Sequence, residues 1–304
     1  MIGGGGYVGT RLAAELAGAG RRVTVLGRRA APDHALASGV TYRQGDFADA
    51  ALLGGLLDEH NEVVHLAYAS SPNTVFDAPL ADLMQNLTPA MELFDAAARR
   101  NRKLMLVSSG GSVYGQALEL PISELHPTRP ISPYGVTKLT LENYARLHSM
   151  TSGLRLICVR PANAYGVGQL PFLGQGFVST AMASAMRGDA IKIFGRQGTV
   201  RDYLYIDDLA SGLASALDFG RPGETYNLGS GMGLSNQNML DAMKPLLLGM
   251  GVELRVEYLP ERPYDVKANV LDSRKLHDCS GWQARIGLEE GLRRTADWLR
   301  DVCG

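Results

Sequence analysis

The chain has 304 residues, of which 45% are apolar and 20% charged, so it can bury a substantial core as one large or two fused domains. Thirty basic and 31 acidic residues leave a formal charge of -1, and no basic stripe typical of nucleic-acid binders is visible. No apolar run approaches the ~20 residues that cross a bilayer, and no signal peptide is visible. Three widely spaced cysteines without a CxxC pair indicate neither a disulfide framework nor a zinc site: Cys158, Cys279 and Cys303. We therefore expect a cytoplasmic protein that binds no metal, membrane or nucleic acid.

Short apolar runs alternate with helical stretches through the first half of the chain. The expected strands are 23–26, 63–66, 104–107 and 154–159, and the expected helices are 9–19, 50–59, 80–100 and 134–150. Apolar strands separated by helices are typical of a parallel sheet covered on both faces, which predicts a doubly wound α/β (Rossmann) fold. We expect the dinucleotide-binding domain over 1–165. A smaller, mainly substrate-binding lobe over 166–304 should partly return to the sheet.

A glycine cluster at the start of the chain runs directly into the first expected helix. Gly3, Gly6 and Gly9 allow a tight turn and a close approach to a pyrophosphate, and the helix N-terminus adds free N–H groups. Such a cluster also fits a flexible tail, but the helix and strand that follow supply the βαβ context of a dinucleotide site. Only Met1 and Ile2 precede the glycines, where a strand of about five residues is expected. Either the sequence starts inside this central strand or the strand is unusually short, which should lower stability.

The end of the expected strand 23–26 bears on the choice of cofactor. Many dinucleotide folds carry an acid there for the ribose 2′-hydroxyl, but this chain has Arg28 and Arg29. Two guanidinium groups can hold a 2′-phosphate, which favours NADP slightly over NAD, although both can also be solvated loop residues. Asp46 is placed to bind the adenine amino group or to cap the next helix. Six further residues are expected at this site: Tyr7, Val8, Phe47, Leu66, Ala67 and Asn86.

Tyr134 and Lys138 form the candidate catalytic pair. They lie four residues apart and therefore on one face of the expected helix 134–150. The spacing alone fits an ordinary surface pair. The strand that ends before Ser108 makes it specific, because the carboxyl ends of such strands face the cofactor crevice.

Together these motifs resemble the extended short-chain dehydrogenase/reductases, and most of all their UDP-galactose (UDP-glucose) 4-epimerase branch. The matching segments follow the family's order: the glycines at 3–9, SSGGSVYG at 108–115, YGVTK at 134–138, RPANAYG at 160–166, RDY at 201–203, YNLGSG at 226–231, RPYD at 262–265 and GW at 281–282. The resemblance implies an NAD(P)-dependent sugar-nucleotide enzyme in which Tyr134 exchanges a proton with a sugar hydroxyl. A free tyrosine has a pKa near ~10, so Lys138 and the oxidised nicotinamide are expected to lower the pKa of Tyr134.

One member of the family's catalytic set is missing. The expected Ser or Thr, four residues before Tyr114, is Gly110. Our first candidate for the missing hydroxyl is Ser112 and our second is Ser109, although Ser112 also fits a turn cap after the strand. Family dehydratases place Asp-Glu directly after this hydroxyl, and the corresponding Gly111-Ser112 argues against a 4,6-dehydratase.

Four residues match the family's substrate side: Asn163, Arg201, Arg262 and Asn269. The first three correspond to residues that bind the nucleotide diphosphate and its ribose. The two arginines can instead form structural salt bridges with Asp202 and Asp265. Asn269 falls where a large tyrosine can restrict the sugar pocket, so the smaller side chain would admit a 2-acetamido group.

Three functions and one assembly follow from the resemblance. We favour a C4 epimerase that acts on a nucleotide-diphosphate hexose (UDP-glucose/galactose or the N-acetyl forms) through a 4-keto intermediate. The alternative is an NADPH-dependent 4-ketoreductase of a nucleotide-linked 4-keto-6-deoxy sugar, to which the two neighbouring arginines point. A non-catalytic nucleotide sensor is disfavoured by the intact Tyr-Lys pair. Helices 80–100 and 134–150 correspond to the pair of helices that each subunit contributes to the family's four-helix dimer interface. We therefore expect a homodimer, unless both helices are buried within one subunit.

Overall fold

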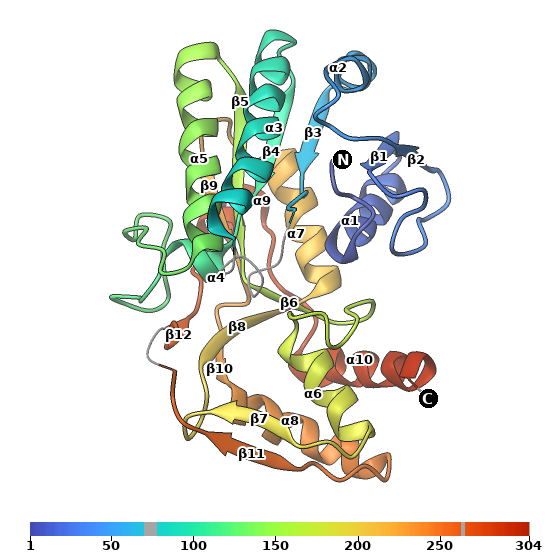
Figure 1. The fold of residues 1–304 in the computed structure, drawn as a ribbon, viewed down its shortest axis with the longest axis vertical. Helices are drawn as coiled ribbons and strands as arrows, with labels where there is room; N and C mark the ends of the chain where they lie inside the picture. The colour runs from blue at the N-terminus through green and yellow to red at the C-terminus, as the bar shows by residue number, and fades with distance from the viewer. Residues whose placement is uncertain (70–77, 263–264, 304) are drawn as a thin grey trace.

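The computed structural model describes residues 1–69, 78–262 and 265–303, and Figure 1 shows them as a larger upper and a smaller lower lobe. The upper lobe is built on parallel strands: β1 (Val23–Gly27), β2 (Val40–Gln44), β3 (Glu62–His65), β4 (Lys103–Val107), β5 (Arg155–Pro161) and β9 (Thr225–Leu228). Strands β2 and β1 form one part of the sheet, and β3, β4, β5 and β9 follow in that order in the other part. Ile2 joins the two parts through parallel bridges to Leu26 and His65. The predicted doubly wound fold is confirmed.

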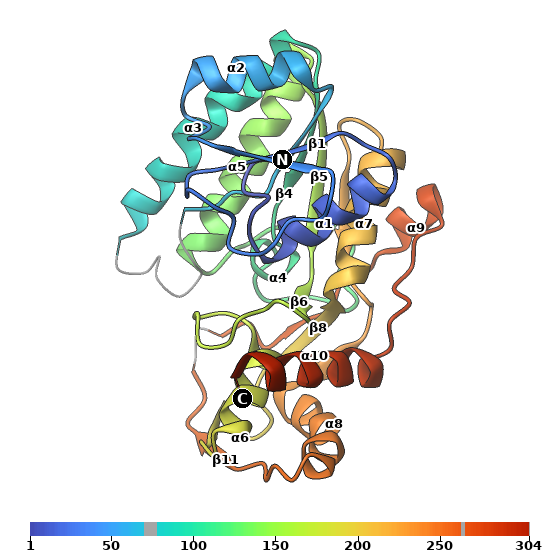
Figure 2. The same ribbon diagram turned by 90° about the vertical axis from the view of Figure 1, so that its right-hand side faces the viewer.

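Helices cover both faces of this sheet, as Figure 2 shows. One face carries α2 (Ala50–Glu59), α3 (Pro79–Arg99) and α5 (Pro133–Ser152), and the other carries α1 (Tyr7–Gly18), α7 (Ile206–Phe219) and α9 (Arg274–Ser280). The side chains of alternate residues of β4 pack on opposite faces of the sheet. Leu104 and Leu106 join the core that includes Leu93 of α3, whereas Met105 joins the core that includes Leu12 of α1. The four helices expected from the sequence start at, or within two residues of, the predicted positions.

Local sequence sets the ends of α5, the helix of the candidate catalytic pair. The Ser132 hydroxyl accepts from a first-turn N–H, Pro133 opens the helix, and Gly153 ends it in the left-handed conformation with φ 69°. On the inner side of α5 the Glu142 carboxylate accepts from the guanidinium of Arg160 in β5 at 2.6 Å, and both side chains are buried. This ion pair fixes the helix against the sheet beside the candidate site.

The lower lobe has smaller sheets and its own core. Strand β8 (Val200–Tyr205) pairs with β6 (Asn163–Tyr165), β10 (Gly233–Ser235) and β12 (Ala268–Asn269), and β7 (Ile191–Phe194) pairs with β11 (Val256–Leu259). Helices α6 (Phe177–Met186), α8 (Asn236–Gly249) and α10 (Leu288–Cys303) pack together in this lobe. After residue 165 the chain also returns to the upper lobe as α7, β9 and α9. Among the described helices, none combines the length and apolar character needed to cross a membrane.

Candidate active site

The glycine cluster forms a turn that excludes side chains. Gly3 has φ +76°, and a Cβ there would lie 2.6 Å from the backbone nitrogen of Ala67. A Cβ on Gly9 would lie 2.4 Å from the Cα of Gly4. Gly6 is the N-cap of α1, so the helix N-terminus opens at the turn. The turn is therefore shaped for close backbone approach to an anionic group.

Two adjoining cavities, of about 850 Å³ and 620 Å³, meet at this turn and share Gly3, Gly6, Leu66 and Tyr68. The larger one extends to Arg28, Arg29, Asp46, Phe47, Ala67 and Asn86. The smaller one extends to Tyr7, Val8, Gly9, Tyr134 and Lys138. Every residue predicted to bind the cofactor lines one of the two cavities. Their combined shape, with a helix N-terminus midway, fits an extended dinucleotide.

The charged groups at the wall of the larger cavity differ from the expected pair of free arginines, because a carboxylate lies among them. The guanidinium of Arg29 forms an ion pair with Asp33, and the backbone N–H of Asp33 donates to the carbonyl of Gly5 at 3.1 Å. The loop after β1 thus folds over the glycine turn and brings a carboxylate to the cavity wall. Asp33 was not predicted, because an acid is expected at the end of β1 and Asp33 lies in the loop beyond it. Arg28 lies at the same wall.

Asp46 does not cap helix α2, so this alternative is wrong. Its carboxylate accepts from the N–H of Ala48 at 3.0 Å. The cap is Asp49, which accepts from the first-turn N–H groups at 3.0 and 3.1 Å. Asp46 instead lies at the wall of the larger cavity, where its binding of adenine stays a prediction.

Tyr134 and Lys138 both line the smaller cavity, next to the end of β4. The Lys138 ammonium donates to the carbonyl of Val107 at 3.1 Å and lies 4.7 Å from the ring centroid of Tyr68. It lies 5.9 Å from the ring centroid of Tyr134. The rings of Tyr68 and Tyr134 meet edge to face at 4.8 Å. The predicted pair is thus brought together at the cofactor crevice.

The protein groups do not lower the pKa of Tyr134 as expected. Burial raises this pKa to about 12, a hydrogen bond from Ser109 lowers it in part, and the charge of Asp82 raises it. Burial also lowers the pKa of Lys138 to about 8. The desolvation of the phenolate therefore outweighs the stabilisation by neighbouring groups, and a further positive charge is needed to activate the phenol.

The structure favours Ser109 over Ser112 as the candidate hydroxyl, the reverse of the expected order. Hydrogen bonding by Ser109 lowers the pKa of Tyr134, and the Ser112 hydroxyl lies 3.2 Å from that of Ser109, one step further from the phenol. Position 110 begins the short helix α4 (Gly110–Val113) and has no room for a side chain. A Cβ on Gly110 would lie 2.5 Å from Leu271 Cδ1. Ser109, one residue earlier, is therefore the better-placed candidate for the missing hydroxyl.

Beside the pair lies a hydrogen-bonded group in which Tyr68 and Asp82, which were not predicted, join the predicted residue Asn86. The hydroxyl of Tyr68 donates to the carboxylate of Asp82 at 2.7 Å, and Asn86 donates to the backbone carbonyl of Asp82 at 2.7 Å. Asn86 also accepts from the N–H of Ala69 at 2.9 Å. Asp82 lies one helical turn before Asn86 and Tyr68 follows directly on Ala67, so position alone could have indicated both.

A third cavity, of about 750 Å³, continues into the lower lobe and shares Asn163 and Arg201 with the smaller cavity. Arg201 donates through Nη1 to the carbonyls of Val200 and Val266, both at 2.8 Å. Asp202 instead accepts from backbone N–H groups, among them that of Leu271 at 3.2 Å. The predicted alternative of an Arg201–Asp202 salt bridge is therefore wrong.

Arg262 lines the same third cavity but has a carboxylate partner. Its Nε lies 2.9 Å from the carboxylate of Asp265, and its guanidinium lies 4.0 Å from the ring centroid of Phe194. The structural salt bridge is confirmed at this position. The guanidinium is held at the cavity wall, whereas residues 263 and 264 of the predicted motif lie outside the described residues.

The structure does not bring Asn269 to the sugar pocket. Its side chain is fully buried on β12, it lines none of the three cavities, and its amide nitrogen donates to the carbonyl of Gly110 at 3.0 Å. This amide supports the first turn of α4 from behind. The pairing of β12 with β8 places this residue in the core, and admission of a 2-acetamido group through its smaller side chain stays a prediction.

Comparison with known proteins places this geometry in a family. The chain is 32% identical over 260 residues to a UDP-glucose 4-epimerase of Mycolicibacterium smegmatis, covering 85% of this chain and 82% of that protein. It is 30% identical to a dTDP-glucose 4,6-dehydratase of Streptomyces antibioticus, covering 99% and 92%. The solved UDP-glucose 4-epimerase of Thermotoga maritima with UDP-glucose matches with a TM-score of 0.91 at 28% identity, over 100% of this chain and 98% of that one. The Thermus thermophilus UDP-glucose 4-epimerase in complex with NAD matches with a TM-score of 0.88 at 30% identity, over 98% and 97%. Residues 1–229 match the model of the NAD dependent epimerase/dehydratase family, and the chain belongs to this family.

Proposed function

We propose that this enzyme is a C4 epimerase of a nucleotide-diphosphate hexose, with UDP-glucose and UDP-galactose as the first candidates. One observation carries the proposal: Tyr134 and Lys138 line the smaller cavity, which adjoins the larger cavity at the glycine turn and shares Asn163 and Arg201 with the third. A sugar placed at this junction would have its carbinol beside the phenol and its diphosphate toward the arginines. The relatives named UDP-glucose 4-epimerase support the same choice.

Tyr134 is the proton-transfer group in this proposal. Bringing a phenol from a pKa of about 12 to near neutrality requires ~7 kcal/mol of preferential stabilisation of the phenolate. One cation about 4 Å away supplies ~4 kcal/mol at an effective dielectric constant of 20, so Lys138 alone is insufficient. When bound, an oxidised nicotinamide accepts and returns the hydride and adds a second positive charge beside the phenol. Tyr134 then takes the proton from the sugar oxygen and later gives it back, while Ser109 stabilises the phenolate through its hydrogen bond.

The lower lobe mainly binds the nucleotide part of the substrate in this proposal. Arg201 is held by two backbone carbonyls and Arg262 by Asp265, so both guanidinium groups are oriented before an anion arrives. Preorganised guanidinium groups suit a diphosphate because little side-chain entropy is lost on binding. Asn163, at the boundary of the second and third cavities, is placed to bind the same diphosphate.

We infer that the cofactor is NAD, although the sequence slightly favoured NADP. Arg29 is engaged by Asp33, so the two-arginine clamp for a 2′-phosphate is incomplete. The carboxylate of Asp33 at the cavity wall suits a ribose 2′-hydroxyl and repels a phosphate. The solved relative from Thermus thermophilus in complex with NAD supports this choice. Arg28 at the same wall is the one observation that favours an NADPH-dependent 4-ketoreductase.

The outer faces of α3 and α5 support a homodimer. The two helices pack side by side and expose apolar residues, namely Leu80 and Met84 on α3 and Val136, Tyr144, Leu147 and Met150 on α5. We propose that two copies pair through this face as a four-helix interface. An apolar face of this kind on a monomer would otherwise remain in water. We place the enzyme in the cytoplasm.

The test is to purify the protein, identify any dinucleotide released on denaturation, and assay UDP-galactose without added cofactor. Released NAD together with formation of UDP-glucose is the expected result. An empty protein that instead oxidises NADPH with a nucleotide-linked 4-keto sugar would overturn the epimerase and establish the ketoreductase.

A further inference from the structure

Tyr68 lies where the two adjoining cavities meet, and its ring contacts both members of the candidate catalytic pair. It lies just after β3 and lines the larger and the smaller cavity alike. The Lys138 ammonium lies 4.7 Å from the centroid of its ring, and the ring of Tyr134 meets it edge to face at 4.8 Å. A side chain with these contacts can influence the pair without itself exchanging the substrate proton.

Helix α3 holds Tyr68 in this place at two points. The Tyr68 hydroxyl donates to the carboxylate of Asp82 at 2.7 Å, and the N–H of the next residue, Ala69, donates to the side chain of Asn86 at 2.9 Å. Asp82 and Asn86 are both buried and lie one helical turn apart. Asn86 also donates to the Asp82 carboxylate at 3.2 Å, so the acceptor of the Tyr68 hydroxyl is itself oriented. The ring of Tyr68 is therefore fixed beside the crevice.

The two neighbouring tyrosines differ in what their hydroxyl groups contact. Burial raises the pKa of both, that of Tyr134 to about 12 and that of Tyr68 further still. Hydrogen bonding by Ser109 lowers the pKa of Tyr134 in part, whereas the bond to the Asp82 carboxylate adds to the increase for Tyr68. A phenol that ionises beside a carboxylate loses its hydrogen bond and gains a like charge as its neighbour. Tyr68 therefore stays protonated.

Lys138 benefits from an aromatic neighbour because its ammonium is buried. Burial lowers its pKa to about 8, against the smaller opposite effects of Cys158, Glu142 and Asp82. From β3 the ammonium is faced by His65, whose own pKa is lowered to about 3 by burial and then by the charge of Lys138. The negative face of an aromatic ring stabilises a nearby ammonium, most strongly where water is excluded. The Tyr68 ring thus favours the charged form of Lys138.

We propose that Tyr68 is a positioning residue: the face of its ring keeps the Lys138 ammonium charged and in place in the crevice, and Asp82 anchors the ring. The carbonyl of Val107 holds the same ammonium through its hydrogen bond at 3.1 Å, so two contacts define where the charge lies. The benefit to Tyr134 rests on the proposed function, whereas the effect of the ring on Lys138 does not.

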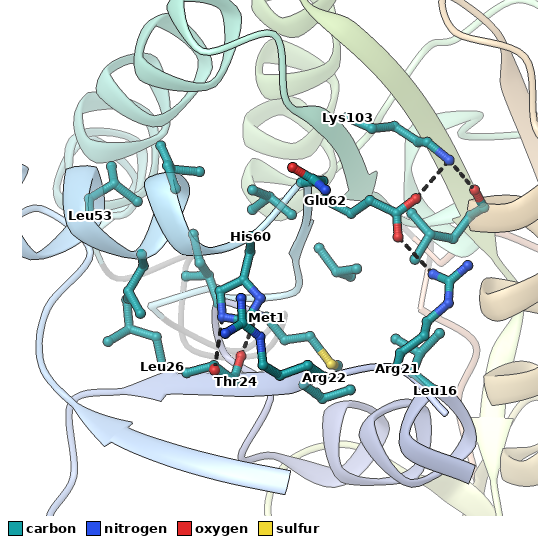
Figure 3. Close-up of a pocket in the computed structure, with 18 of the residues that line it drawn as sticks. Met1, Leu16, Arg21, Arg22, Thr24, Leu26, Leu53, His60, Glu62 and Lys103 are labelled. Atoms are coloured by element: carbon teal, nitrogen blue, oxygen red, sulfur yellow. Dashed lines mark hydrogen bonds and ion pairs between the residues drawn. The ribbon is translucent and has the colours of Figure 1, made fainter. Parts of the chain in front are cut away.

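The opposite end of β3 supplies a control. There the Glu62 carboxylate forms ion pairs with Arg21 and Lys103, at 2.8 Å each, beside a separate cavity of about 550 Å³ (Figure 3). These three residues line none of the three cavities of the candidate active site. Glu62→Gln therefore weakens the contacts of the same strand without touching the crevice.

The first measurement titrates Lys138 in the protein without cofactor or substrate. The Cε resonance of isotope-labelled lysine reports the pKa, and its absence from Lys138→Arg identifies it. Tyr68→Leu should lower the pKa of Lys138 by about one unit, the effect of losing a cation–π contact away from water. Tyr68→Phe keeps the ring and should lower it by less than half as much, and Glu62→Gln should leave it unchanged.

Two results of this titration would overturn the proposal. The pKa of Lys138 could be unchanged in Tyr68→Leu, which would mean that the ring does not stabilise the ammonium. It could also fall equally in the two Tyr68 variants, which would assign the effect to the hydroxyl and not to the ring. The titration needs no substrate, so its outcome stands apart from that of the proposed reaction.

The second measurement compares turnover of the nucleotide sugar in two variants. Tyr68→Phe should keep at least about a tenth of the wild-type rate, because the Tyr68 hydroxyl does not exchange the substrate proton, whereas Tyr134→Phe should lose nearly all of it. A loss in Tyr68→Phe as large as that in Tyr134→Phe would contradict a positioning role for Tyr68.

Discussion

Hydrogen bonding by the Ser109 hydroxyl lowers the pKa of the Tyr134 phenol, and Ser109 lies one residue before the position at which the family's catalytic hydroxyl is expected. The bond lowers the pKa of Tyr134 against the larger effect of burial. Gly110 cannot supply the group, because a Cβ there would meet Leu271 and the carbonyl of Arg160, the latter at 2.9 Å. In our proposal, Ser109 therefore contributes to the activation of the phenol.

We therefore expect Ser109→Ala to lower kcat by roughly 10- to 100-fold, the effect of losing one hydrogen bond to a charged group. The activity should also rise at higher pH than in the wild type, because loss of the bond raises the pKa of Tyr134 and the deprotonated phenol is the base. Ser112→Ala, one hydroxyl further away, is the matched control and should cost less than roughly fivefold. Equal losses in the two variants would mean that Ser109 has no special role.

The choice between the two nicotinamide cofactors should depend on Asp33. Asp33→Ala removes the carboxylate and frees Arg29, so NAD should bind roughly tenfold more weakly and NADP more tightly. Dissociation constants from titration calorimetry of both dinucleotides test this. Asp33→Asn, which keeps the size of the side chain, should show the same direction. Unchanged affinities in both variants would remove Asp33 from the cofactor site.

The buried ion pair of Glu142 and Arg160 should be important for stability. Glu142→Gln leaves the guanidinium buried without its charged partner, and we expect a loss of ~3–5 kcal/mol in the free energy of unfolding. Denaturant titration measures it. Glu290→Gln, which breaks the surface ion pairs with Arg293 and Arg294, should leave the midpoint nearly unchanged. A similar small effect of both substitutions would contradict the account.

Stability should fall in mild acid because of His65. Burial, and to a lesser extent the charge of Lys138, lowers the pKa of His65 from 6.5 to about 3. Between these values the unfolded chain binds a proton that the native protein does not, so the free energy of unfolding decreases as pH falls through this window. The loss attributable to His65 at pH 5 should be ~2 kcal/mol. His65→Leu should remove this part of the pH dependence, whereas His277→Asn, at an exposed site, should retain it. If the free energy of unfolding changed with pH equally in the wild type and in His65→Leu, the assignment would be refuted.

Much of the upper lobe could be predicted because its signals are local. Apolar runs predicted β1, β3, β4 and β5 but not β2 and β9, and the glycine turn and the Tyr134–Lys138 spacing indicated the crevice. Asp33 could not be found in this way, because a loop carries it back over Gly5. Asn269 was assigned to the pocket by spacing, but its orientation depends on the pairing of β12 with β8, which links residues far apart in the sequence. The preference between Ser109 and Ser112 depended on the path of the short helix after β4.

The central claim is that the phenol of Tyr134 moves the substrate proton, and Tyr134→Phe tests it most directly. The substitution removes one oxygen and keeps the ring against Tyr68. Turnover of the nucleotide sugar should fall by at least about 10³-fold, within the range expected for loss of a general acid–base group, while calorimetry should show the nucleotide sugar bound with nearly wild-type affinity. A variant that retains most of the wild-type rate would contradict the account.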